Sequence, residues 1–412
     1  YVGWPIRRAS GINQLSCMTT KIFFFSPLLL LAGLSIAQKK YPVLTVPGKT
    51  AITHIDSSGA SVLASGRLVT PAGRTLRISH DPFGIAVSPD GKKTVTLHDG
   101  VFTIIDNQSL QSHMVGWVGD IPGADRPAFV RASYKASIPS PLRHGSFLGI
   151  SFGKDNHTVY LSGGDDGSVI VYDIDRYQRI DSLSLNGLFR GQEYDDSFTS
   201  DLLYDDKNDQ LLVLDRGNFR LVRIDLRSRT IIASIPVGRQ PFGIALSPDH
   251  RLAFVANVGM YDYPLMPDIT PENYDSSLLP WHPYGNNTPE SIHGTTWKGR
   301  KVPGLGSPND PKAMSVYVVD LATNQVTDRY KPGYQVGEMI EGAEVVGGAS
   351  PNSLAVGSHY AYVTNASNDN ISIIDYRTHR LLGHIPLRVS PLLDHYRGLL
   401  PFGIALSPDE KT

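Results

Sequence analysis

Short runs of hydrophobic residues, separated by turns rich in glycine, proline and aspartate, recur along the chain from residue 81 onward. The segment 81–90 contains Pro-Phe-Gly-Ile-Ala-Val-Ser-Pro-Asp, and nearly the same residues return at 241–249 and 401–409. Weaker copies begin near Phe147, Leu202 and Ser353. Self-similarity at such a spacing is typical of a repeat architecture.

Each repeat contains three more runs after the first. The second is apolar, and the fourth is more polar, as in 230–237 and 380–387. Four short strands per unit are typical of a propeller blade, whose first strand is buried on both faces and whose fourth alternates at the rim. The second runs are 94–97, 158–161, 210–214, 252–256 and 361–364. The third runs end on Asp106, Asp173, Asp225, Asp320 and Asp375.

The sequence therefore predicts an all-β fold, a β-propeller of four-stranded blades over 81–412, with five complete repeats and the first strand of a sixth. Ser-Pro-Asp-Gly at 88–91 predicts a tight turn, because proline presets φ and glycine tolerates a positive φ. Each repeated aspartate is expected to accept hydrogen bonds from the backbone of its own turn, rather than to bind a metal or to catalyse.

Tyr-Val-Thr-Asn at 362–365, followed by Ile-Ser-Ile-Ile-Asp at 371–375, resembles the YVTN-repeat β-propeller family, and Phe-Val-Ala-Asn at 254–257 is a variant of the motif. This resemblance implies a seven-bladed propeller similar to the quinoprotein amine dehydrogenase-like and lactonase-like propellers. It makes the segment 38–80 a candidate to complete the last blade and close the ring, through the strand-like runs 42–46, 51–55 and 67–70. A shared fold does not imply a shared activity.

Three other segments resemble exported bacterial proteins in which such a propeller precedes a phosphoesterase domain of the alkaline-phosphatase superfamily. They are 63–68 before the first blade, 302–306 in a long insertion, and 347–353 before the fifth blade. The resemblance implies a fragment without the phosphoesterase domain. No residue of this chain corresponds to a metal-binding or nucleophile position of that domain.

The N-terminal part predicts export. The first methionine is Met18, and the apolar run 22–34 ends shortly before Ala37. This order is typical of a signal peptide over 18–37 that is cleaved after Ala37, with 1–17 as upstream leader sequence. The run is too short for a hydrocarbon core of roughly 30 Å. We therefore expect a periplasmic or extracellular product without a transmembrane segment; a buried strand or helix is the alternative.

Composition narrows the functional classes. Lys plus Arg number 38 and Asp plus Glu 39, a net charge of -1 with no basic block, which argues against a nucleic-acid partner. The one cysteine, Cys17, lies in the leader, so the mature chain is expected to have no disulfide. A hydrophobic share of 41% suffices for a substantial core.

The search for chemistry predicts no catalytic residue, cofactor or metal site. No Walker loop, GxGxxG, HExxH or GxSxG motif occurs, and the histidines are scattered without metal spacing. The stretches 165–167 and 205–209 resemble calcium loops, but they lack the closing glutamate and fall in expected hairpin turns.

All the long excursions are expected on one face of the propeller. In a four-stranded blade, the turn between the second and third strands and the link to the next blade both emerge opposite the first turn. Loops on a rigid scaffold commonly bind ligands, which predicts one functional surface. The alternative is that these insertions have no function and accumulated because surface loops cost little closure entropy. The segments are the links 118–146, 186–199, 331–350 and 388–400, and the insertion 258–314 in the fourth repeat.

The insertion 258–314 is rich in proline and aromatic residues, and segments of this length are functional or disordered more often than neutral. An aromatic and cationic patch would suit a small anionic ligand, a sugar or a partner domain. Alternatively, the aromatic side chains pin the insertion onto the blades. The candidate binding residues are Trp281, His282, Trp297, Lys298 and Arg300.

Three functions from different classes follow. The first is a non-catalytic exported propeller that binds a small ligand, a protein or its own C-terminal phosphoesterase domain. The second is a lactonase-like hydrolase, which needs an acid–base and metal cluster at the axial mouth. The third is a structural cell-surface repeat protein. We expect the full-length product to be monomeric, and the segment 38–412 alone to be unstable or to associate through unpaired strand edges.

Overall fold

The computed structural model describes residues 45–412 except 57, 58, 71, 77, 79, 80, 117–137, 143, 144, 265–268, 271, 272, 274–287, 298 and 389–397. The chain divides into two compact units, residues 1–75 and 76–412. In the described part of the first unit, β1 (Ser61–Val62) pairs with β2 (Leu68–Val69), and His54 bridges to Val62. The run 67–70 therefore contains a strand, whereas 51–55 contributes the bridge alone.

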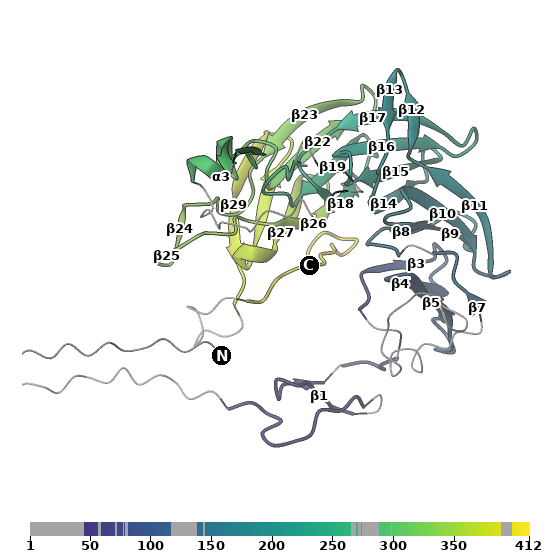
Figure 1. Cartoon of the computed structure of the whole chain (residues 1–412). Helices are drawn as coiled ribbons and strands as arrows, with labels where there is room; N and C mark the ends of the chain where they lie inside the picture. The colour runs from purple at the N-terminus through teal and green to yellow at the C-terminus, as the bar shows by residue number, and fades with distance from the viewer. Residues whose placement is uncertain are drawn as a thin grey trace, which may run out of the picture. The chain divides into compact units, whose positions relative to one another are not determined.

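The second unit consists of repeated antiparallel sheets whose strands follow chain order. Figure 1 shows that in the middle sheets the first strand, such as β14 or β18, lies on the inner side and the last, such as β17 or β23, on the outer side. The first sheet contains β3 (Gly84–Val87), β4 (Lys93–His98), β5 (Val101–Asp106) and β6 (Ser112–Gly116). The second contains β8 (Ile150–Phe152), β9 (Thr158–Ser162), β10 (Ser168–Asp173) and β11 (Gln178–Ser184).

The remaining sheets have the same order. The third contains β14 (Thr199–Asp205), β15 (Gln210–Asp215), β16 (Arg220–Asp225) and β17 (Thr230–Pro236). The fourth contains β18 (Pro241–Leu246), β19 (Leu252–Asn257), β22 (Ser315–Asp320) and β23 (Gln325–Tyr330). The fifth contains β26 (Pro351–Val356), β27 (Tyr360–Asn365), β28 (Asn370–Asp375) and β29 (Arg380–Pro386). These blade-like sheets confirm the predicted all-β fold class.

The first sheet differs from the prediction because it has a fifth strand. β7 (Ile138–Pro139) runs parallel to β6 at the outer edge, with Val115 opposite Ile138. Pro139 has no N–H to donate, and such a residue is tolerated at a sheet edge. The expectation of four strands in every blade was therefore wrong for this one.

The repeated aspartates act in their own turns, as predicted. The Oδ1 atom of Asp106 accepts hydrogen bonds from the N–H groups of Gln108 at 3.0 Å and Ser109 at 2.7 Å. Hydrogen bonds from the Ser109 backbone and side chain hold the pKa of Asp106 below its ordinary value. Equivalent backbone contacts occur at Asp173, Asp225, Asp320 and Asp375.

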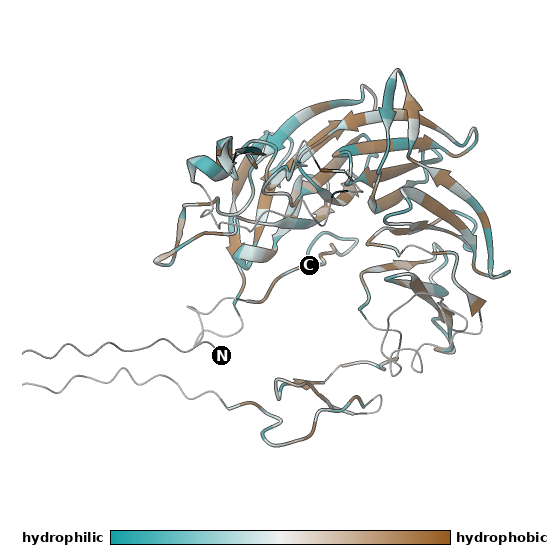
Figure 2. Ribbon diagram, viewed as in Figure 1, coloured by the Kyte–Doolittle hydropathy of each residue, from teal (hydrophilic) through white to brown (hydrophobic). Residues whose placement is uncertain are grey.

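The core lies between successive sheets, where four hydrophobic clusters join the five sheets in chain order. Figure 2 shows the middle strands as largely hydrophobic and β23 as mixed. Glycine in Pro-Phe-Gly permits the close approach of neighbouring first strands. A Cβ atom on Gly84 would lie 2.2 Å from the Leu148 carbonyl oxygen, and one on Gly243 would lie 2.2 Å from that of Asn352.

The last repeat differs from the prediction, since 401–406 forms no strand. The segment still contacts the fifth sheet, because Thr364 Oγ1 donates to the Phe402 carbonyl at 2.9 Å and Asn352 Nδ2 to that of Pro401 at 3.3 Å. A strand requires a partner with which to form a ladder, and no described strand pairs with this segment.

Candidate binding face

The alternating strand directions place the turns after each second strand and the links between blades at the same edges of the sheets. We call this surface the loop face. Three of its long segments carry elements of their own: the link hairpins β12 (Gly187–Phe189)–β13 (Gln192–Tyr194) and β24 (Met339–Ile340)–β25 (Ala343–Glu344), and, in the insertion, α3 (Pro289–His293) with the hairpin β20 (Gly294–Trp297)–β21 (Arg300–Pro303). Most of the link 118–146 and of 388–400 lies outside the described residues.

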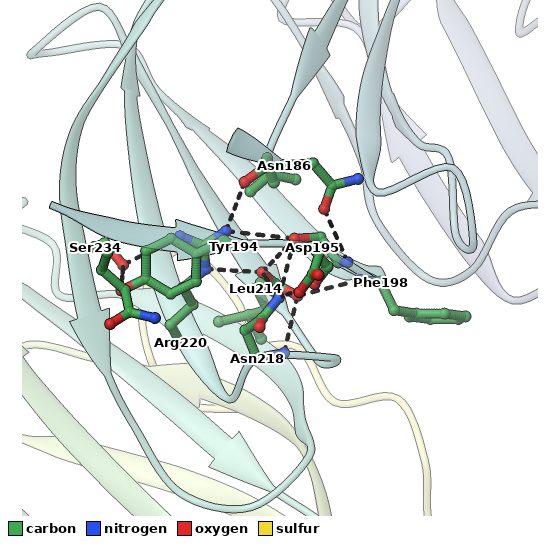
Figure 3. Close-up of polar contacts among 12 residues, drawn as sticks. Asn186, Tyr194, Asp195, Phe198, Leu214, Asn218, Arg220 and Ser234 are labelled. Atoms are coloured by element: carbon green, nitrogen blue, oxygen red, sulfur yellow. Dashed lines mark hydrogen bonds and ion pairs between the residues drawn. The ribbon is translucent and has the colours of Figure 1, made fainter. Parts of the chain in front are cut away.

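A buried arginine anchors the first of these hairpins. Arg220, at the start of β16, is 1% exposed, and Figure 3 shows its side chain beside Tyr194 of β13. Its guanidinium carbon lies 3.5 Å from the centroid of the Tyr194 ring. Arg220 Nε donates to Asp215 Oδ2 at 2.8 Å, and Nη2 donates to the Leu185 carbonyl at 2.6 Å. The charge is thus paired, hydrogen-bonded and covered by an aromatic face.

Asp215 extends this network to the end of the link. Its carboxylate accepts hydrogen bonds from Ser197 Oγ at 2.8 Å, from the Phe198 N–H at 3.1 Å, and from Asn218 Nδ2 at 3.0 Å (Figure 3). A buried ion pair is tolerated when its remaining polar atoms are satisfied in this way. The link 186–199 is therefore held in one conformation at both ends.

A second buried arginine anchors the insertion 258–314. Arg239 is 3% exposed and forms a bidentate salt bridge with Asp262. Nε donates to Oδ1 at 2.5 Å, and Nη2 donates to Oδ2 at 2.9 Å. Its Nη1 atom donates to the carbonyl groups of Met260 and Ser307, both at 2.8 Å. One side chain therefore ties the beginning of the insertion to its end.

The predicted site residues are only partly described. Trp297 and Arg300 are cross-strand partners in the β20–β21 hairpin, and both are half-buried. Trp281, His282 and Lys298 lie outside the described residues. An aromatic and cationic patch made of all five thus stays a prediction, as does the alternative that these aromatics pin the insertion.

Phenylalanine side chains at or just before the first strands of the second, third and fourth sheets, together with Phe402 of the last repeat, gather on the loop face. The Phe147 ring lies 5.5 Å from that of Phe198 and 5.4 Å from that of Phe242, and Phe242 lies 5.5 Å from Phe402. Edge-to-face geometry at these distances is favourable. The Arg216 guanidinium lies 5.7 Å from the centroid of Phe147 and 5.9 Å from that of Phe198, within cation–π range.

A cavity of about 340 Å³ opens beside these rings, and we call it the mouth cavity. Its walls come from the segment before β3, the β4–β5 and β9–β10 turns, and the ends of two links. Ser146 fixes the wall, since its hydroxyl accepts from the Gly100 N–H at 3.1 Å and donates to the His98 carbonyl. The lining residues are Asp81, Phe83, Asp99, Gly145, Ser146, Phe147, Gly164, Asp165 and Phe198.

A larger cavity, of about 650 Å³, lies on the opposite face between the fourth and fifth sheets. Its walls combine short turns with strand residues, and two of its carboxylates are paired locally. Arg251 Nε donates to Asp320 Oδ2 at 3.2 Å, and His379 Nδ1 lies 2.8 Å from Asp328 Oδ1. Because Asp320 and Asp328 already have partners, this groove offers a cationic ligand less than its volume indicates.

Asp205, Asp206 and His250 form the one group of three metal-ligand side chains among the described residues. Burial raises the pKa of Asp205, but hydrogen bonds from Gln210, Asn208 and His250 outweigh it and leave that pKa below its ordinary value. The Asp205 oxygens thus already have partners, with His250 Nδ1 at 2.7 Å.

In other blades too, a side chain in the turn between the first and second strands forms a hydrogen bond with the same turn of the preceding blade. Asn156 Oδ1 accepts from the Asp90 N–H at 2.8 Å, and Glu410 accepts from the Ser358 N–H at 2.8 Å. Asn156, His250 and Glu410 all have positive φ values and each contacts the first turn of the preceding blade. The His250 cluster is accordingly explained as a tie between blades.

Asp201 is the one described carboxyl group whose pKa is strongly raised. It lies on the innermost strand β14, and burial raises its pKa to about 7. Its Oδ2 atom accepts from the Ile244 N–H of the fourth sheet at 3.1 Å, and Oδ1 accepts from the Leu202 N–H at 2.9 Å. It therefore links two neighbouring first strands.

Sequence reasoning missed the mouth cavity, although part of the signal was present. Phe83 and Phe242 occupy the same position in the repeated Pro-Phe-Gly motif, and equivalent positions of first strands converge in a propeller. In the sequence, Asp165 belongs only to a calcium-like turn. Asp99 and Phe198 carry no motif, so nothing in the sequence indicated that they share a cavity.

No protein-family model matches the chain, and a search of the curated proteins finds no relative. In the part of the chain that the structure describes, no helix is long and apolar enough to span a membrane.

Proposed function

We propose that this chain is the binding module of an exported β-propeller protein, and that the loop face carries the interaction. The observation that carries the proposal is the anchoring of two loop-face excursions by the buried side chains Arg220 and Arg239. Ordering a loop before binding reduces the entropy lost on association, so anchored loops support recognition.

The ligand of the proposed module is a small molecule, a protein or a phosphoesterase domain of the same polypeptide. The last partner rests on the resemblance of the segments 63–68, 302–306 and 347–353 to exported propeller–phosphoesterase proteins. A lactonase-like activity would need a metal and acid–base cluster on the loop face. Among the described residues the one group of three metal-ligand side chains lies in first turns, on the other face.

The test is a binding panel with three classes of probe: disaccharides, organic phosphates and alkylammonium ions. We expect at least one class to raise the melting temperature of the purified chain, since a ligand that binds only the folded state stabilises it. Trp297→Ala, on the loop face, is compared with Arg377→Ala, which lines the cavity on the opposite face.

Binding that is lost in Arg377→Ala and kept in loop-face variants would contradict the proposal, and binding of no probe class would exclude these small molecules as the ligand. A parallel assay with γ-butyrolactone and p-nitrophenyl phosphate, with and without divalent metal ions, is expected to show no turnover. Metal-dependent turnover that one Asp or His substitution abolishes would establish the hydrolase instead.

A further inference from the structure

We propose that the loop face binds an organic carboxylate at Arg216, beside the phenylalanine rings that gather there. The inference rests on the proposed function and names the ligand class for one site of that face. Arg216 follows β15 directly, in the turn to β16, and Gln240 directly precedes β18, at the end of the link from the third to the fourth sheet. Both residues therefore belong to the loop face.

The Arg216 guanidinium is held by side chains from neighbouring blades. Its carbon lies 5.7 Å from the centroid of Phe147 and 5.9 Å from that of Phe198, and ring faces attract cations. Nη2 donates to Gln240 Oε1 at 2.9 Å, and the Arg216 N–H donates to the Phe198 carbonyl at 2.8 Å. The head group is thus positioned before a ligand arrives, which reduces the entropy lost on binding.

The charge of Arg216 differs from that of the two anchoring arginines. Arg220 and Arg239 each form an ion pair with an aspartate, whereas in the part of the chain that the structure describes Arg216 has Gln240 as its side-chain acceptor. Burial alone lowers the pKa of Arg216, so no described carboxylate acts on it at close range. Because Arg216 is half-buried, it attracts an anion more strongly than a fully exposed cation would.

The shape and the charge of the guanidinium favour a carboxylate. Arginine presents several N–H donors in a planar fork that matches the two oxygens of a carboxylate, and Gln240 accepts from only one of its nitrogens. One guanidinium also balances one negative charge, whereas a phosphate ester carries about two. Asp99 and Asp165 line the mouth cavity beside the same rings and would repel the second charge.

The rings favour a ligand with an apolar group next to its carboxylate. Phe147, Phe198 and Phe242 are half-buried, so part of each side chain remains open to contact. Burying apolar surface against them adds to the affinity of the head group. An aromatic and cationic patch, which the sequence predicts for the insertion 258–314, is thus formed here by other residues of the loop face.

The experiment titrates the purified chain by calorimetry with hexanoate, with its neutral isostere hexanamide, and with acetate, at low and high salt. We expect hexanoate to bind, hexanamide not to bind, and salt to weaken the binding of hexanoate. Acetate should bind more weakly than hexanoate, because it lacks the apolar chain.

Arg216→Gln should weaken the binding of hexanoate by about tenfold, the loss expected for a charge-assisted contact. Arg190→Gln is the matched control and should leave the affinity unchanged. Arg190 is also an exposed arginine of the loop face with a cation–π contact, since its guanidinium carbon lies 5.2 Å from the centroid of Phe189.

Gln240→Glu separates loss of binding from loss of folding. The new carboxylate would take the place of the amide oxygen that accepts from Arg216, so it would pair with the guanidinium within the chain. We expect the affinity for hexanoate to fall by about tenfold or more, with no decrease in the melting temperature.

A peptide comparison identifies the source of the carboxylate. Acetyl-Gly-Leu with a free carboxylate represents the C-terminus of a protein partner, hexanoate represents a free acid, and the tighter of the two identifies the source. The amidated peptide is the control and should not bind.

The failure of this inference differs from that of the proposed function. If sugars or phosphates bind the loop face while no carboxylate does, the proposed function stands and the carboxylate site falls. Equal affinity for hexanoate in the wild type, Arg216→Gln and Gln240→Glu also overturns the site, whatever else the face binds. Hexanoate binding that is lost in Arg377→Ala and kept in Arg216→Gln overturns both.

Discussion

Gly84 and Gly243 occupy the same position of the Pro-Phe-Gly motif, and each faces a carbonyl oxygen of the next first strand at a distance that excludes a Cβ atom. Gly403 has the same place in the motif, but no atom of the described residues lies within 4 Å of its Cβ position. In the turn between the first and second strands, by contrast, His250 and Glu410 adopt a positive φ, as Gly91 does at the equivalent position of the first repeat. Side-chain contacts to the preceding blade accompany that strain in both cases.

At the residue scale, Asp201 predicts a pH dependence. Its pKa rises from 3.8 in the unfolded chain to about 7 in the fold. The fold therefore prefers the protonated form, and the resulting stability is full below about pH 4 and is lost as the pH rises through 7. Thermal melts of the wild type from pH 5 to pH 8 should show this loss, on the order of a few kcal/mol.

The control is Asp201→Asn, in which this decline should be absent. His384 acts in the opposite direction in the same window, because burial lowers its pKa and its protonation destabilises the fold as the pH falls. The difference between wild type and variant isolates Asp201 from this effect. Parallel pH profiles of the two proteins would show that Asp201 ionises normally.

At the scale of elements, two segments of the loop face, the link 186–199 and the insertion 258–314, are anchored by buried arginines. Arg220 pairs with Asp215 and contacts Tyr194 of β13, whereas Arg239 joins the two ends of the insertion 258–314. Both hold segments that lie outside the four hydrophobic clusters of the core. They therefore connect the stability of the sheets with the order of the loops.

We predict that Arg220→Met lowers the free energy of unfolding by about 3–5 kcal/mol, because it leaves the buried Asp215 carboxylate without its counter-charge. Hydrogen exchange should also become faster in the segment 186–199. The matched control is Arg227→Met, since Arg227 forms an exposed pair with Asp209 at 3.6 Å. That change should cost less than about 1 kcal/mol. Equal effects of the two substitutions would contradict the anchoring.

At the scale of the whole molecule, four hydrophobic clusters join each sheet to the next. Within residues 76–412, none of these described clusters includes Ile85 or Val87 of β3. Ile85 is 69% exposed and Val87 is 54% exposed. Ile244 and Leu246, their counterparts in β18, pack against the cluster that joins the third and fourth sheets. Closure of the ring and the number of blades stay predictions.

We predict that the segment 38–412 alone associates as its concentration rises, since exposed apolar sheet faces favour contact with other copies. The double variant Ile85→Lys, Val87→Lys should increase the monomer fraction measured by light scattering after size exclusion. Ile180→Lys, at an exposed isoleucine of the outer strand β11, should not change it. A monomeric wild type with a cooperative melt above about 60 °C would count against this prediction.

The amino-acid sequence alone determined the fold class, the order of strands within each repeat and the role of Asp106 and its counterparts. These features depend on side-chain period and on hydrogen bonds to N–H groups two or three residues away, so they can be derived locally. Only the tertiary structure decided that β7 joins the first sheet and that Asp201 meets Ile244, 43 residues further along the chain. It likewise decided that Asp99, Asp165 and Phe198 share one cavity. Such contacts depend on how one blade packs against the next, which no local pattern of residues specifies.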